Sequence, residues 1–61
     1  MNVRIIKKIN RSYTLLKRLQ TTYQPYVVAW KFDPVTSTWA QGHYFHTLKA
    51  AEDWIKLHVE N

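Results

Sequence analysis

The chain has 61 residues, with nine Lys and Arg against four Asp and Glu, so its formal net charge at pH 7 is +5. This length allows one domain with a small core, and the absence of Cys excludes disulfides and thiolate metal sites. No apolar run reaches the roughly 20 residues of a membrane span, and the first residues lack the apolar segment of a signal peptide. The sequence therefore predicts a soluble, cytoplasmic protein that aromatic side chains stabilise.

The positive charge is concentrated near the N-terminus. Residues 1–20 contain six cations and no acid, whereas residues 21–61 contain three Lys and four acids. This asymmetry is typical of a protein that meets phosphates or another anionic partner on one surface. The alternative is a Lys-rich edge strand that prevents pairing with other chains. The six cations are Arg4, Lys7, Lys8, Arg11, Lys17 and Arg18.

Residues 1–20 predict a basic pair of strands. Val3, Ile5 and Lys7 share one face of an alternating pattern, residues 10–12 are turn-forming types, and alternation resumes over residues 13–20. A helix is the alternative, because apolar residues also recur every three or four positions. The β-branched residues and the central turn favour strands.

Residues 26–45 predict a β-hairpin. An aromatic and β-branched strand over residues 26–32 is followed by a turn that begins at Asp33, and the return strand covers residues 38–45. If Asp33 and Thr38 close the loop, Phe32 lies opposite Trp39, Trp30 opposite Gln41, and Val28 opposite His43. The bulky face then contains Tyr26, Val28, Trp30, Phe32, Trp39, Gln41, His43 and Phe45, and the small face contains Val27, Ala29, Lys31, Ala40, Gly42 and Tyr44.

Residues 47–60 predict an amphipathic helix that Thr47 caps. Its apolar arc covers about half the circumference, which is more than one sheet contact needs. Trp54 and Leu57, at the margin of this arc, are therefore interface candidates. Together the elements predict one α+β domain over residues 1–61, with a three- to four-stranded antiparallel meander packed on one C-terminal helix.

The helix can cover only one face of this sheet. Burial of large side chains favours the bulky face, because each is worth roughly 1.5 to 3 kcal/mol. In the alternative, Ala50 and Ala51 pack on the small face. The bulky face would then be an open aromatic surface suited to stacking on bases or to groove contacts. Its exposed residues would be Trp30, Trp39, Gln41 and His43.

Residues 30–55 contain a characteristic set of residues in the predicted turn, at the junction between strand and helix, and in the helix. In these residues the segment resembles the arm-type DNA-binding domain of phage and transposon tyrosine recombinases, also called integrases. The resemblance covers most of the C-terminal half of the chain, and it implies a three-stranded sheet, backed by a helix, that enters the DNA major groove. Ser37 stands where that pattern has Gly, and residues 38–41 lack its basic residues. The matching residues are Asp33, Pro34, Thr36, Phe45, Thr47, Ala51, Glu52 and Trp54.

No catalytic or metal site is predicted. His43 and His46 point to opposite faces of an extended strand, and a single Gly cannot form a phosphate-binding loop. His58 lies in the apolar arc of the helix, which favours packing over catalysis. The sequence thus predicts a non-enzymatic protein without cofactor, small-molecule substrate or membrane contact.

Two functions fit these features. One is a small DNA-binding module of phage or mobile-element type, which in the absence of a recombinase catalytic domain implies an accessory or regulatory factor. The other is a protein interaction module without a nucleic-acid role, such as a phage-type inhibitor or adaptor or an obligate homodimer. The predicted DNA contacts are Arg4, Lys7, Lys8, Arg11, Lys17, Arg18, Trp30, Lys31, Trp39, Gln41 and His43.

Overall fold

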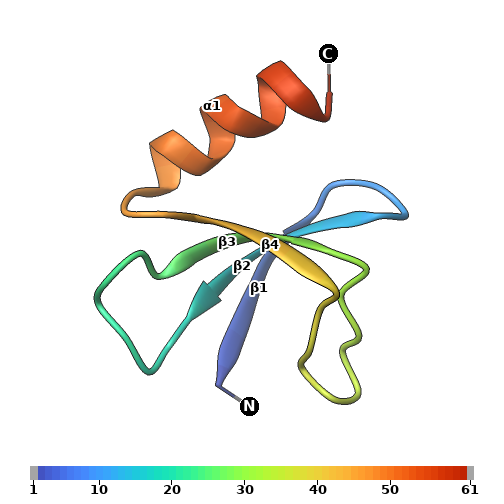
Figure 1. Cartoon of the computed structure of the whole chain (residues 1–61), viewed down its shortest axis with the longest axis vertical. Coiled ribbons are helices and arrows are strands. Elements are labelled where there is room, and N and C mark those ends of the chain that lie inside the picture. The colour runs from blue at the N-terminus through green and yellow to red at the C-terminus, as the bar shows by residue number, and fades with distance from the viewer. Residues whose placement is uncertain (1, 61) are drawn as a thin grey trace.

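The computed structural model describes residues 2–60 and consists of one antiparallel sheet and one helix (Figure 1). The sheet order is β1-β2-β3-β4, so each strand pairs with its neighbour in the sequence and the topology is a meander. This confirms the predicted α+β fold, and it shows strands rather than a helix near the N-terminus. The elements are β1 (Val3–Lys8), β2 (Tyr13–Arg18), β3 (Tyr26–Trp30), β4 (Gln41–Phe45) and α1 (Leu48–His58).

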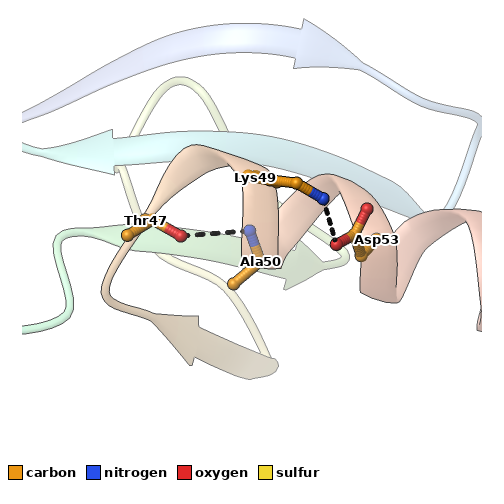
Figure 2. Close-up of polar contacts among 4 residues, drawn as sticks. All are labelled: Thr47, Lys49, Ala50 and Asp53. Atoms are coloured by element: carbon orange, nitrogen blue, oxygen red, sulfur yellow. Dashed lines mark hydrogen bonds and ion pairs between the residues drawn. The ribbon is translucent and has the colours of Figure 1, made fainter.

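Helix α1 begins where the sequence predicts. The Thr47 hydroxyl accepts a hydrogen bond from the Ala50 backbone N–H at 3.1 Å, which satisfies one of the free amides of the first turn (Figure 2). Lys49, in the first turn, and Asp53, one turn further on, form an exposed ion pair at 3.1 Å. Among residues 2–60, no helix combines the length and apolar character that crossing a membrane requires.

Helix α1 packs against β3 and β4 and covers one side of the sheet, which we call the helix face. Leu15, Val28, Ala51 and Ile55 form its buried core. The helix therefore covers the bulky face, as the burial argument predicts. The alternative, in which Ala50 and Ala51 pack on the small face, is wrong.

The opposite side, which we call the loop face, also has a buried core. Leu16, Val27 and Ala29 are completely buried there, although no helix covers them. Phe32 and Trp39, from the loop between β3 and β4, pack against these residues. Figure 1 shows this loop on the side of the sheet away from α1. The two central strands are therefore buried on both faces.

The β3–β4 hairpin confirms part of the predicted register. Trp30 pairs with Gln41 and Val28 with His43, and an isolated bridge joins Asp33 to Thr38. The regular strands are shorter than predicted, however, because β3 ends at Trp30 and β4 begins at Gln41.

The prediction that Phe32 and Trp39 lie on the bulky face is wrong, because both pack on the loop face. Lys31 has a φ of 56°, in the left-handed region. A left-handed residue interrupts the alternation of side chains along a strand. The alternation that puts Trp30 on the helix face therefore does not continue to Phe32.

Strand β1 contains a similar interruption. Ile5 pairs with Leu16 but Lys7 pairs with Leu15, so Ile6 is an extra residue in a β-bulge. Ile5 and Lys7 consequently lie on opposite faces of the sheet, and the prediction that they share one face is wrong.

Candidate nucleic-acid interface

The six cations of the N-terminal third lie on the edge strand β1, on the neighbouring strand β2 or in the turn between them. β1 is the edge strand, and every residue of it after Val3 is exposed. The turn between β1 and β2 is built by Asn10, whose Oδ1 accepts hydrogen bonds from the backbone N–H groups of Ser12 and Tyr13 at 2.8 and 2.9 Å. We call the group of side chains on these strands and their turn the cationic edge: Arg4, Lys7, Lys8, Arg11 and Lys17.

Two members of the cationic edge stand side by side on the helix face. Arg4 pairs directly with Lys17 in the β1–β2 register. Both border a hollow of about 320 Å³ beside the start of α1, where Tyr26 and Leu48 supply apolar wall. The Lys17 ammonium lies 5.7 Å from the centroid of the Tyr26 ring, within the range of a cation–π contact. This register therefore places two positive charges next to each other on the helix face.

Neighbouring acids neutralise little of the cationic edge. Lys7 lies 3.7 Å from the Glu60 carboxylate, and both side chains are about half exposed. An exposed pair of this kind contributes at most about 1 kcal/mol. Among residues 2–60, this is the only ion pair that any member of the cationic edge makes. The edge therefore presents a largely uncompensated positive charge to solvent.

Lys8 places a cation on the loop face. It pairs with Thr14 and borders a hollow of about 120 Å³ together with Ile5, Phe32 and Pro34. Positive side chains consequently reach around both faces of the same edge.

Arg18, a predicted DNA contact, is instead occupied within the fold. Its Nη2 donates to the carbonyl oxygens of Tyr23 and Gln24 at 3.2 and 2.9 Å. Its guanidinium carbon lies 4.7 Å from the centroid of the Tyr44 ring. Arg18 thus anchors the β2–β3 loop to β4, a structural role that its place in a basic strand does not reveal.

The structure does not form the open aromatic surface proposed for DNA. Trp30, Gln41 and His43 lie on the helix face, whereas Trp39 packs on the loop face. His43 stacks on Trp54 of α1 with a ring-centroid distance of 4.3 Å. The Lys31 ammonium lies 4.6 Å from the centroid of the Trp30 ring. These residues therefore do not act together as one surface.

The two interface candidates on α1 differ in their surroundings. Trp54 is half-buried and contacts Tyr13 and Phe45 as well as His43, so it wraps over the sheet. Leu57 is 67% exposed and faces solvent. Within residues 2–60, no three His, Asp or Glu side chains are grouped as a metal site would require.

Comparison of the chain with protein-family models, with curated proteins and with solved structures finds no match. The resemblance to the arm-type domain of tyrosine recombinases therefore stays a prediction that depends on the quoted residues alone.

Proposed function

We propose that this chain is a small, non-enzymatic DNA-binding module of phage or mobile-element type that contacts the phosphate backbone with its cationic edge. The supporting observation is that Arg4, Lys7, Lys8, Arg11 and Lys17 lie on one pair of strands and its turn. Within residues 2–60 only one of them, Lys7, forms an ion pair, and that pair is weak. Lys and Arg contacts to phosphates supply much of the affinity of such proteins, because each releases condensed counterions from the nucleic acid.

The shape of the edge suits a duplex. The major groove of B-form DNA accepts a two-stranded β-ribbon, and phosphates flank the groove on both sides. The β1–β2 turn projects beyond the sheet in Figure 1, and Arg11 lies in this turn. Arg4 on the helix face and Lys8 on the loop face then face opposite walls of the groove. Cations on both faces of one edge are thus the arrangement that groove insertion requires.

The test is a titration of a fluorescent DNA duplex with two variants of equal net charge. Arg4→Gln/Lys8→Gln removes two cations from the edge, and Lys49→Gln/Lys56→Gln removes two from α1. If each lost phosphate contact costs about 1 kcal/mol, the edge variant binds about 30-fold more weakly than the wild-type chain. The helix variant changes affinity only through net charge, by a few-fold.

Equal weakening in both variants would show that net charge alone attracts DNA and would contradict the proposal. The proposal would also be contradicted if the wild-type chain binds neither a duplex nor a single strand below the micromolar range at low salt.

A protein interaction module is the second candidate function. Ile5 and Ile6 are 46% and 40% exposed on the same edge, and Leu57 is exposed on α1. Exposed apolar side chains on an edge strand favour pairing with another protein strand. This function predicts assembly that depends on protein concentration and responds little to salt, which sedimentation equilibrium measures.

A further inference from the structure

The loop face contains a hollow of about 390 Å³ that the cationic edge does not use. It lies between the start of β1, the loop after β2 and the loop between β3 and β4. Both loops extend from the side of the sheet away from α1 in Figure 1. Its volume falls within the range of about 300 to 1,000 Å³ that is usual for small-molecule sites.

The polar side chains around this hollow are all able to donate hydrogen bonds. They comprise one guanidinium, two amides and two hydroxyls, and no carboxylate from residues 2–60 borders the hollow. Donors without a neighbouring negative charge favour an anion, and a guanidinium suits the oxygens of a phosphate. These residues are Asn2, Arg18, Gln20, Thr21 and Ser37.

Arg18 is held in place independently of any ligand. Its two hydrogen bonds to loop carbonyls and its contact with Tyr44 fix the guanidinium plane. Its Nε is buried and has no hydrogen-bond partner among residues 2–60. A preorganised cation loses little side-chain entropy when it binds an anion.

Trp39 adds a flat aromatic wall to the hollow. Its indole is half-buried and is fixed by a hydrogen bond from Nε1 to the Tyr44 hydroxyl at 3.2 Å. A fixed indole beside a cation offers a stacking surface for a planar ring.

We propose that this hollow binds a phosphate group attached to a planar ring, the chemistry of a nucleoside monophosphate. The Nη1 group of Arg18, which takes no part in the two hydrogen bonds to loop carbonyls, and the Ser37 hydroxyl receive the phosphate. Trp39 stacks on the ring. The site lies on the loop face and does not depend on the DNA-binding function proposed above.

Gln20 offers the sharpest variant, because it is exposed and its replacement spares the anchors of the fold. Gln20→Glu places a carboxylate beside the phosphate site. Gln41→Glu is the matched control, since it makes the same chemical change at an exposed position in β4 that does not border the hollow.

The experiment follows the indole and backbone N–H signals of the ¹⁵N-labelled chain by NMR while a nucleoside monophosphate is added. We expect the Trp39 indole signal and the amide signals of Gln20, Thr21 and Ser37 to shift. The unphosphorylated nucleoside and inorganic phosphate should each need at least roughly tenfold higher concentrations. Gln20→Glu should weaken binding about tenfold, and Gln41→Glu less than about twofold.

A second arm distinguishes a free nucleotide from one within a strand. A short 5′-phosphorylated single strand that shifts the Trp39 signal at lower concentration than the mononucleotide identifies a strand as the source of the phosphate, and the reverse order identifies a free nucleotide. No shift of the Trp39 signal up to about 10 mM nucleotide overturns the proposal, as does equal weakening by the two variants. If the nucleotide still shifts the Trp39 signal in the Arg4→Gln/Lys8→Gln variant, the hollow binds nucleotide independently of the cationic edge.

Discussion

The two faces of the sheet are covered by different means. On the helix face, Ala51 and Ile55 of a capped, regular helix bury Leu15 and Val28. On the loop face, irregular backbone carries Phe32 and Trp39 over an equally buried core. Residues 2–60 thus form two cores around one sheet, and within them the second core is covered without a further helix or strand.

The sequence specifies the helical cover and the loop cover in different ways. The helical cover follows from a repeated pattern over residues 48–58, so one substitution leaves most of it intact. The loop cover depends on a few backbone conformations, with left-handed φ values of 56° at Lys31 and 58° at Ser37. We therefore expect the helix face to be sensitive to lost volume and the loop face to be sensitive to local backbone and steric changes.

The largest effect is expected on the helix face. Ile55 is 3% exposed, and Ile55→Ala leaves a cavity against Leu15 and Val28. We expect a loss of about 2 to 5 kcal/mol in the free energy of unfolding, measured by urea denaturation. Leu57→Ala, on the exposed side of the same helix, should change it by less than about 0.5 kcal/mol. Similar losses in both variants would contradict the packing described here.

A steric change tests the loop face. A Cβ at Gly42 would lie 2.8 Å from Trp39 Nε1 and 3.1 Å from Val27 Cγ1. Gly42→Ala should therefore destabilise the chain by about 1 to 3 kcal/mol. The cost should fall in a Trp39→Leu background, because the smaller side chain leaves room for the methyl group. An unchanged cost in that background would show that Trp39 does not cover Gly42.

The helix cap gives a smaller effect. Thr47→Ala removes the hydroxyl that accepts from the Ala50 N–H, and we expect a loss of about 1 kcal/mol. Thr47→Asn retains an acceptor and should recover most of the stability lost in Thr47→Ala. Thermal unfolding followed by circular dichroism measures both changes. If Asn and Ala behave alike, the hydrogen bond is not what stabilises the helix start.

The smallest expected effect is an increase in stability. Ser37 adopts a left-handed φ of 58°, which glycine adopts without steric cost. Ser37→Gly should raise the free energy of unfolding by up to about 1 kcal/mol. Thr36→Gly, at a neighbour without a positive φ, should lower it by about 0.5 to 1 kcal/mol. Two changes of the same sign would contradict the backbone difference between these positions.

The sequence predicts the helix face well, because Thr47 and the apolar spacing of α1 act locally. The switch of Phe32 and Trp39 to the loop face is not predictable from residue type, since Lys at position 31 gives no sign of a left-handed φ. One signal was present: Leu15 and Leu16, like Val27 and Val28, are adjacent apolar residues. Such runs are typical of strands buried on both faces.

The candidate site also has one part that the sequence predicts and one part that it does not. The cations of residues 1–20 are visible as a charge block, and the β1–β2 strand pair with its turn carries all of them in the cationic edge except Arg18. The structural role of Arg18 depends on Tyr23, Gln24 and Tyr44, which are brought to it by the chain fold. Spacing along the sequence does not reveal contacts of this kind.

The salt dependence of duplex binding tests the cationic edge most directly. Each phosphate neutralised contributes about −0.9 to the slope of log K against log salt concentration, so four to five contacts predict a slope of roughly −3.5 to −4.5. Arg4→Gln/Lys8→Gln should reduce its magnitude by about 1.8. A slope near zero, or one that this variant leaves unchanged, would contradict the assignment of DNA binding to the cationic edge.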